Sequence, residues 1–518
     1  MADITRGVRS FTLGTAISRV TGLFREMVFA YLYGASTATD AFQASFRLLD
    51  LLRDLFAETT LSSAIIPVLT EEKNKGKINQ NRLASNTFNV LLLVVGSITL
   101  LFIVFAPQLV RLIAFGFAKI PGKTELTVHL TQLIMPFLLM VALAAWAMSY
   151  LNTENKFFVP AVAPAWFNIF SILVPLMVYQ SLIHRGIDPI FGMAYGVLVG
   201  GLLQFGSQIP ALIKNGFRYQ VYLNLKDPAL RKVFYLFIPV AIGLASSRIN
   251  VMVDTLMVSF LEEKSMTYLH YAFRIMHLPL GLFGIAVGVV SLPSLSQLVV
   301  EKNWEEFQAT LTRSFQLVFL LTIFSSVFTA FFAHPICRIV YERGKFIPMD
   351  TDATAAALIF YILGVPFASG LRNVATAFYA CKDSKTPMYV SLGTIIINVA
   401  LNYSLMKLMS FRGIALATSI SAGINFGLLL SLLQKRITKI DLHRLIKFVS
   451  LITVGSTVGS GVGIMTFNYL CENFRPGLFI QIFILIGTGF LALTIFYLYC
   501  QVLKIKEALQ ILKQLFRR

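Results

Sequence analysis

The sequence predicts an all-α polytopic membrane protein with about 14 transmembrane helices. Two observations lead to this fold class. Hydrophobic residues make up 56% of the 518 residues, and the mean hydropathy is +0.73. Apolar runs of about 20 residues, the length that an α-helix needs to cross a bilayer, recur along the whole chain. Because the connections between these runs are short, we expect any chemistry to take place within or beside the membrane.

The first six expected spans form a lobe over residues 1–225. The first span ends at the turn-like residues 33–36, and the second ends before a run of basic residues at 73–82. The six expected spans are 8–33, 41–70, 85–113, 126–151, 159–182 and 190–213.

Six further spans are expected in a second lobe over residues 226–440, and a weak internal repeat relates the two lobes. Ser-Arg at 18–19 recurs at 247–248, and Phe-Arg at 46–47 recurs at 273–274. Because the repeat is six spans long, both lobes have the same orientation, as in transporters that bind substrate between two halves. We therefore expect a central cavity walled by spans one, two, seven and eight. The spans of the second lobe are 232–260, 266–299, 307–332, 351–380, 387–407 and 412–434.

Residues 441–518 are expected to add two more spans, at 445–470 and 478–503, and a tail. From Lys504 onward, basic residues alternate with apolar residues at helical spacing. This pattern is typical of an amphipathic helix that lies along the inner surface of the membrane. A coiled-coil or partner-binding segment is the alternative interpretation.

We attribute the net charge of +19, from 44 Lys and Arg against 25 Asp and Glu, to basic loops on the cytoplasmic side of the membrane. No long basic stripe with interleaved aromatic residues accompanies it, so we expect no nucleic-acid partner. If the N-terminus is cytoplasmic, the cytoplasmic loops carry more than twice as many Lys and Arg residues as the opposite loops, and both termini lie inside. The N-terminus lacks the pattern of a cleaved signal peptide. The four cysteines are scattered and are expected to be free thiols.

Residues 18–67 combine the hydropathy of membrane spans with many charges. An arginine facing lipid at the bilayer centre costs about 2.5–3.5 kcal/mol, so these side chains must face a wet surface. On a helical wheel the polar residues of the second span lie within an arc of roughly 140°. One interpretation is a structural network of ion pairs, and the other is a hydrated cavity that receives a polar substrate. The residues of this arc are Asp40, Gln43, Arg47, Asp50, Arg53, Asp54 and Glu58.

The arginines of the expected cavity favour an anionic substrate. Arg25, Arg53 and Arg274 carry forked guanidinium groups that bind phosphate oxygens in pairs. An alternative is that they lock the two lobes together and exchange partners during transport. In span eight, Arg274 and His277 lie near one side of the helix together with a seam of glycines, which permits close approach of a neighbouring helix.

A second polar group is a candidate cation site. Asp254 in span seven, Asn398 and Asn402 in span eleven, and Thr418 in span twelve offer oxygen atoms suited to a monovalent cation or a proton relay. An interhelical hydrogen-bond cluster is the alternative. The chain carries no sequence motif of a phosphate-binding loop, a zinc protease or a serine hydrolase, so we expect a transporter rather than an enzyme. We expect no cofactor apart from Na⁺ or H⁺ as a coupling ion.

Several motifs resemble the MurJ (MviN) family of lipid II flippases, within the superfamily of multidrug and polysaccharide exporters. The resemblance extends over essentially the whole chain, including the two C-terminal spans that distinguish this family from relatives with twelve spans. The motifs are S-R-x-x-G-x-x-R-E at 18–26, G-A-x-x-x-T-D-A-F at 34–42, L-L-R-x-x-F-A-E at 51–58, Y-A-x-R at 271–274, Y-E-R-G-K-F at 341–346 and K-T-P at 385–387.

This resemblance implies a protein of the bacterial cytoplasmic (inner) membrane. Its substrate and partner would be lipid II, the undecaprenyl-diphosphate-linked disaccharide-pentapeptide, with membrane lipid and the cell-wall synthesis machinery as further partners. The last two spans would form a groove for the lipid tail. At His277 the family carries an acid, so the charge of Arg274 must be balanced differently here. By position, the family's cavity arginines match Arg19, Arg25, Arg53 and Arg274, and its acids match Asp40 and Glu58.

Our hypothesis is therefore an alternating-access flippase in which Arg25, Arg53 and Arg274 bind the diphosphate. One alternative is an exporter of another lipid-linked oligosaccharide or of a drug, which the two additional spans and the many arginines disfavour. Another is a membrane-embedded glycosyltransferase, which would need a catalytic carboxylate in a larger outer loop than this chain has. A scaffold is the third, and it would tolerate neutral replacements of every cavity charge.

Overall fold

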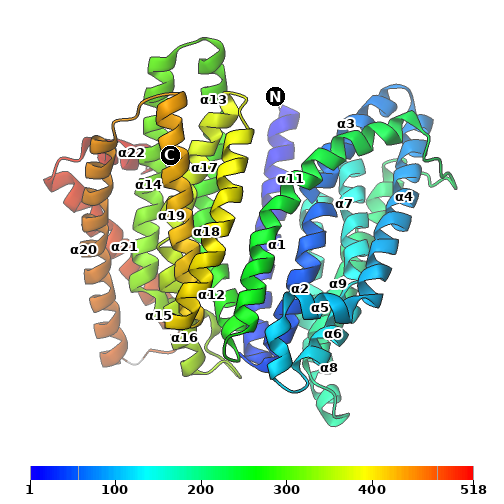
Figure 1. Ribbon diagram of the computed structural model, residues 1–518, viewed down its shortest axis with the longest axis horizontal. Coiled ribbons are helices and arrows are strands. Elements are labelled where there is room, and N and C mark those ends of the chain that lie inside the picture. The colour runs from blue at the N-terminus through cyan, green and yellow to red at the C-terminus, as the bar shows by residue number, and fades with distance from the viewer. Residues whose placement is uncertain (1, 57, 475, 517–518) are drawn as a thin grey trace. The chain divides into compact units, whose positions relative to one another are not determined.

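The computed structural model describes residues 2–56, 58–474 and 476–516. Side chains are described over the same ranges, except those of 2–12, 54, 58–60, 240, 242–250, 285–286, 289 and 512–516. Every regular element of this described part is a helix, which confirms the expected all-α fold class (Figure 1). Ten of the helical segments are long and apolar enough to cross a membrane. The four other expected spans fall on α1, on α2 with α3, on α11, and on α12 with α13.

The helices form two compact units. Unit 1 comprises Met1–Thr267 together with Arg343–Phe346, and unit 2 comprises Tyr268–Glu342 and Ile347–Arg518. This grouping follows contacts between residues, whereas the expected lobe boundaries at 225 and 440 follow the sequence repeat. The lobe boundaries therefore stay a prediction.

Unit 1 contains eleven described α-helices and a short 3₁₀ segment, η1. The strongest packing joins α8 to α9 and α1 to α8, and α3 to α7. The elements are α1 (Ala2–Tyr33), α2 (Thr37–Phe56), α3 (Glu58–Asn74), α4 (Lys77–Val104), α5 (Ala106–Ile113), η1 (Phe115–Lys119), α6 (Lys123–Ile134), α7 (Phe137–Thr153), α8 (Phe158–His184), α9 (Ile190–Gly206), α10 (Ile209–Lys214) and α11 (Pro228–Ser259).

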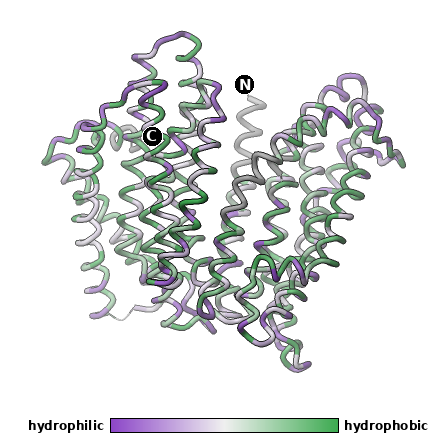
Figure 2. Tube along the Cα trace, in the orientation of Figure 1, coloured by the Kyte–Doolittle hydropathy of each residue, from purple (hydrophilic) through white to green (hydrophobic). Residues whose placement is uncertain are grey.

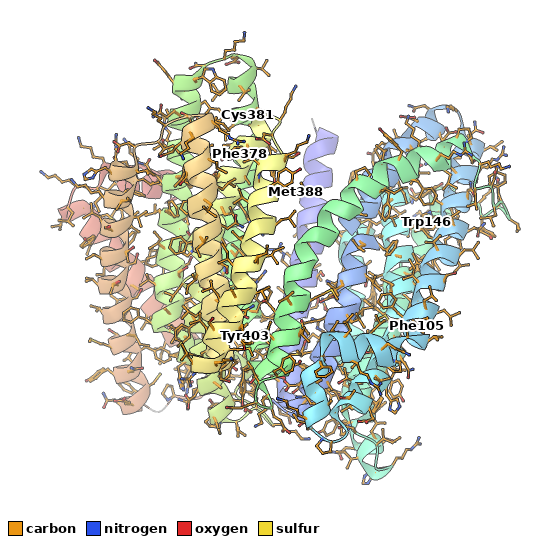
Figure 3. The ribbon with its side chains drawn as sticks, in the orientation of Figure 1. Phe105, Trp146, Phe378, Cys381, Met388 and Tyr403 are labelled. Atoms are coloured by element: carbon orange, nitrogen blue, oxygen red, sulfur yellow. The ribbon has the colours of Figure 1, made fainter. Side chains whose placement is uncertain are left out.

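Polar side chains inside unit 1 are paired across helices. Trp146 of α7 is buried and faces α4 (Figure 3), where its Nε1 donates to the hydroxyl of Thr87 at 3.1 Å. One helical turn along α7, the hydroxyl of Tyr150 donates to Asn81 of α4 at 2.9 Å. Since buried polar groups are costly when unpaired, these bonds fix the rotation of α7 against α4.

A segment without regular structure, residues 217–224, runs beside α4 before α11 begins. Its backbone is bound by α4 side chains rather than by a sheet. Asn86 accepts from the amide of Asn224 at 3.0 Å and donates to the carbonyl of Asn224 at 2.9 Å, and Asn89 donates to the carbonyl of Tyr222 at 3.0 Å. The side chain of Asp227 then caps α11 by accepting from the amide of Ala229 at 2.9 Å.

Unit 2 contains the remaining helices, except that the first three residues of α12, 265–267, belong to unit 1. The span-eight segment is interrupted by a π-helical turn, η2, between α12 and α13. The elements are α12 (Ser265–Pro279), η2 (Leu280–Ile285), α13 (Ala286–Val300), α14 (Trp304–Phe331), α15 (Ala333–Tyr341), α16 (Pro348–Ile362), α17 (Val365–Ala380), α18 (Lys385–Met409), α19 (Phe411–Arg436), α20 (Leu442–Phe474), α21 (Leu478–Val502) and α22 (Lys506–Phe516).

The glycine seam expected in span eight is confirmed at two positions. An added Cβ at Gly284 would lie 2.4 Å from the hydroxyl of Ser369 on α17, and one at Gly288 would lie 3.3 Å from the hydroxyl of Thr376. Gly281, in contrast, faces open space. The small residues therefore allow η2 and α13 to pack closely against α17.

The core of unit 2 is built mainly from α14, α17, α19 and α20, and Phe378 of α17 lies within it (Figure 3). The C-terminal helix α22 joins this core through Ala508, and Ile505, which precedes the helix, is buried there too. One face of the tail thus packs against protein. In Figure 2 hydrophobic residues cover the long helices of both units, whereas hydrophilic residues gather at many of their ends and turns, as expected for helices that cross lipid.

Candidate functional site

Arg25 contacts side chains of both α1 and α8. Its side chain is 11% exposed, and one Nη donates to Glu26 at 2.6 Å. The other Nη donates to Oδ1 of Asn168 on α8 at 3.1 Å, and the guanidinium lies 5.1 Å from the centre of the Phe167 ring. Because α1 and α8 pack along much of their length, the partners of Arg25 are held in place before any ligand arrives.

Asn168 is fixed in turn by α1. Its Nδ2 donates to the carbonyl of Ser18 at 2.9 Å and to the hydroxyl of Thr21 at 3.3 Å. This leaves the amide oxygen directed at Arg25. Neither Asn168 nor Phe167 was expected from the sequence, since the sequence pattern assigns faces of one helix and does not identify partners on another.

The carboxylate of Asp40 is buried and hydrogen-bonded. The residue is 1% exposed, and its Oδ2 accepts from Nζ of Lys123 at 2.9 Å. The carboxylate also accepts from the amides of Lys264 at 2.8 Å and Thr267 at 3.0 Å, and from the hydroxyl of Thr267 at 2.7 Å. Asp40 thus satisfies two amides at the start of α12, and all of these partners belong to unit 1. This geometry fits a positioning role, and direct contact of Asp40 with substrate stays a prediction.

The two arginines of α2 have different partners. Arg47 reaches α11, where it donates to the hydroxyl of Thr255 at 3.1 Å. Arg53 is 33% exposed and forms an ion pair with Asp50 one turn earlier at 3.1 Å. Arg19 on α1 is exposed. The side chain of Glu58 lies outside the described residues, so its predicted role is untested.

In unit 2, Arg274 and His277 lie on α12 and are exposed. The imidazole of His277 packs against Phe273, with ring centres 4.0 Å apart, and its Nδ1 lies 3.1 Å from the carbonyl of Phe273. The ring of His277 thus contacts Phe273 of its own helix. The three predicted diphosphate-binding arginines divide between the units, with Arg25 and Arg53 in unit 1 and Arg274 in unit 2.

Three of the four residues of the predicted cation site share unit 2. Asn402 donates to Oδ1 of Asn398 at 3.0 Å, and Asn398 donates to the hydroxyl of Ser421 at 3.1 Å. The hydroxyl of Thr418 donates within α19 to the carbonyl of Ile414 at 3.0 Å. Asp254 is half-buried in unit 1. Within the described residues, no group of three His, Cys, Asp or Glu could hold a metal ion.

A polar pocket of about 450 Å³ lies at one end of unit 1, where the turn between α3 and α4 meets the start of α11. Its charges are paired with one another. Lys232 of α11 contacts both oxygens of Glu71 at 2.6 and 2.8 Å, and Lys75 contacts Glu72 at 2.6 Å. Arg82 lies 4.2 Å from the centre of the Tyr222 ring and donates to its hydroxyl. The first of these pairs ties α11 to α3.

Comparison with known proteins gives consistent results. A family profile described as "Lipid II flippase MurJ" matches residues 29–485. The "Probable lipid II flippase MurJ" of Vibrio cholerae is 34% identical over 426 residues, covering 80% of each chain. The "Lipid II flippase MurJ" of Burkholderia cenocepacia is 32% identical over 434 residues, covering 83% of each. The corresponding "Probable lipid II flippase MurJ" of Rickettsia prowazekii is 30% identical over 493 residues, covering 95% of this chain and 96% of the other.

Solved structures agree with the sequence relatives. The structure titled "Lipid II flippase MurJ, inward closed conformation" matches with a TM-score of 0.75 and 30% identity, covering 94% of this chain and 98% of the other. An inward-facing multidrug resistance MATE family transporter of the MOP superfamily matches with a TM-score of 0.67 at 13% identity, covering 85% of this chain and 95% of the other. The second match is a likeness of fold alone.

Proposed function

Since this chain belongs to the MurJ family of lipid II flippases, we propose that it moves lipid II from the inner to the outer leaflet of the bacterial cytoplasmic membrane by alternating access. It is a transporter and not an enzyme. The undecaprenyl tail stays in lipid while the sugar-peptide head group crosses within protein, which avoids drawing a long apolar chain through a polar space.

The arginines bind the diphosphate in this proposal. The observation that supports it best is the geometry of Arg25, a largely buried cation that Asn168, Glu26 and Phe167 hold in a defined orientation. A guanidinium fixed in this way binds phosphate oxygens at a small cost in side-chain entropy. Glu26 balances the charge when no substrate is bound. Arg53 and Arg274 are the other proposed diphosphate ligands.

The test uses cells in which this chain is the sole flippase of lipid II, and asks whether lipid II becomes accessible to an added enzyme that cleaves it from outside. We expect accessibility with the wild type and its loss with Arg25→Ala or Arg274→Ala. The matched control is Arg313→Ala, because Arg313 is 74% exposed and pairs only loosely with Glu306 at 3.6 Å. Full activity of both cavity variants would reject the diphosphate role. Accessibility unaffected by loss of the whole chain would indicate another cargo.

The orientation of the chain is part of the proposal. Both termini are placed in the cytoplasm by the distribution of basic loop residues. This places Arg412 outside and Lys435 inside, and both side chains are exposed. A thiol reagent that does not cross the membrane is therefore expected to label Arg412→Cys and not Lys435→Cys in intact cells. The reverse pattern would invert the topology.

Coupling to Na⁺ or H⁺ is also proposed. Asn398, Asn402 and Thr418 supply neutral oxygens in unit 2, and Asp254 supplies a carboxylate on α11. We expect Asp254→Asn to reduce the dependence of transport on the ion gradient while lipid II still binds. Contact with the cell-wall synthesis machinery stays a prediction, for which co-purification with the enzymes that consume lipid II is the direct test.

A further inference from the structure

An amphipathic pocket of about 460 Å³ lies within unit 2, where α14 and α15 meet α20 and α21. Its volume falls in the range of roughly 300–1,000 Å³ that is usual for sites of small organic ligands. Phe331, Ile464 and Phe467 form its apolar wall. Arg338 of α15 and Glu472 of α20 lie on its polar side. The arginines proposed to bind the diphosphate of lipid II, Arg25, Arg53 and Arg274, do not line this pocket.

The pocket lies at the level of a membrane surface. The α14 helix ends at Phe331, and the turn between α20 and α21 follows Phe474. Aromatic side chains surround this turn and are strongly exposed, with Tyr469 at 66%, Phe474 at 73% and Phe479 at 78%. Exposed aromatic residues at the ends of spans are typical of the boundary between hydrocarbon and lipid head groups. We therefore expect the pocket to face phosphates and glycerol groups as well as acyl chains.

The polar side of the pocket carries one cation, Arg338, and one anion, Glu472, and both side chains are exposed. The side chain of Arg338 is 54% exposed, and its Nε lies 3.5 Å from Glu342, which is a long contact for an ion pair. Glu472 is exposed and has no ion-pair partner within the described part of the chain. The neighbouring His334 is already paired with Asp352 at 3.1 Å.

These charges select among lipids. A guanidinium binds a phosphodiester through paired hydrogen bonds. A carboxylate on the same rim attracts an ammonium group and repels a second anionic group. A diphosphate, the charged part of the cargo in the proposed function, would meet the carboxylates of Glu342 and Glu472 as well as the one arginine. The site therefore fits a zwitterionic head group better than a purely anionic one.

We propose that this pocket is a binding site for a membrane glycerophospholipid with a zwitterionic ammonium head group. Arg338 binds the phosphodiester, Glu472 binds the ammonium group, and an acyl chain lies against Phe331, Ile464 and Phe467. With the proposed orientation of the chain, this lipid belongs to the outer leaflet. It is a resident lipid of unit 2 and not the transported substrate.

The test is native mass spectrometry of the full-length protein released from vesicles that contain equal amounts of phosphatidylethanolamine, phosphatidylglycerol and phosphatidylcholine. The wild type is expected to retain phosphatidylethanolamine preferentially. Arg338→Ala is expected to reduce its retention roughly tenfold, as loss of a hydrogen bond to a charged group implies. Arg338→Lys, which keeps the charge and loses the forked geometry, is expected to retain part of the binding. The matched control is Arg412→Ala, a change at an exposed arginine away from the pocket.

Glu472→Gln separates the two charges of the site. It is expected to abolish the preference for phosphatidylethanolamine over phosphatidylglycerol while lipid is still bound. Equal retention of all three lipids by the wild type, or unchanged retention in Arg338→Ala, would overturn the proposal. Arg338 and Glu472 are exposed, so both variants should fold, and size-exclusion chromatography checks this. The outcome does not depend on transport of lipid II, because binding is measured without it.

Discussion

Asp40 and Lys123 form an ion pair of 2.9 Å in which each side chain is only 2% exposed. Taking both charges out of water is costly, and further bonds are needed to offset that cost. The structure supplies them, since two amides and a hydroxyl donate to Asp40, and Nζ of Lys123 lies 4.1 Å from the centre of the Phe117 ring. The pair therefore joins α2, α6 and the start of α12 as one network.

Removal of one partner of this pair should destabilise the fold more than removal of both charges. Lys123→Met leaves an unpaired buried carboxylate and is expected to destabilise the protein by about 3–5 kcal/mol. Lys123→Met combined with Asp40→Asn leaves no buried charge and should recover part of that loss. Thermal unfolding of the purified variants measures both. A double variant less stable than Lys123→Met alone would contradict the ion-pair account.

Asn168 should affect the rate of transport by orienting Arg25, without binding lipid II itself. Asn168→Ala removes one hydrogen bond from Arg25, and bonds to charged groups are worth about 1.5–3 kcal/mol. We expect transport to fall by roughly tenfold or more while Arg25→Ala abolishes it. Asn168→Asp keeps an acceptor for Arg25 and is expected to restore part of the activity. The lipid II accessibility assay measures all three. Wild-type activity in Asn168→Ala would mean that α8 does not orient Arg25.

The sequence was sufficient to predict the helices but not the partners of the charged residues. Long apolar runs encode spans locally, so all fourteen expected spans fall on helices. The short helices α5 and α15 were not expected, because residues 104–106 at the α4–α5 break are apolar and α15 is too short to show as a span. The burial of Lys123 could not be predicted from the sequence, since a lysine in an expected loop is normally solvated. Its burial depends on Asp40, which is 83 positions away.

Loop Arg343–Phe346 should depend on glycine at position 344. Gly344 has φ +58°, a region that costs other residues roughly 1–2 kcal/mol, and an added Cβ would lie 2.3 Å from the carbonyl oxygen of Tyr31. The same carbonyl accepts from the amide of Lys345 at 3.0 Å. We expect Gly344→Ala to lower the unfolding temperature and weaken this contact. Gly477→Ala is the matched control, because Gly477 has φ −63° and open space around its Cα. Equal unfolding temperatures for the two variants would refute the strain argument.

The glycine seam between α20 and α21 should be intolerant of larger residues. An added Cβ at Gly459 would lie 2.5 Å from the carbonyl oxygen of Ala492, whereas one at Gly461 on another side of α20 meets only Phe331 at 3.9 Å. Gly459→Leu must therefore push the helices apart, and Gly461→Leu need not. We expect reduced yield and a lower unfolding temperature for Gly459→Leu only. If both variants behave alike, the close packing of these helices is not needed for folding.

Glu154, at the end of α7, should make stability depend on pH in the acidic range. Burial raises the pKa of its carboxyl, but hydrogen bonds from Lys77, Gln80 and Lys73 outweigh burial and hold the pKa below its usual value of 4.5. A carboxyl whose pKa is lowered by folding contributes stability above its unfolded pKa, and this contribution is lost as the pH falls through the folded pKa. Glu154→Gln should therefore lower the unfolding temperature at pH 7 and have progressively less effect below pH 4.5. Thermal unfolding of the wild type and this variant across that range is the measurement. A difference between them that stays constant with pH would show that the charge of Glu154 does not hold α4 and α7 together.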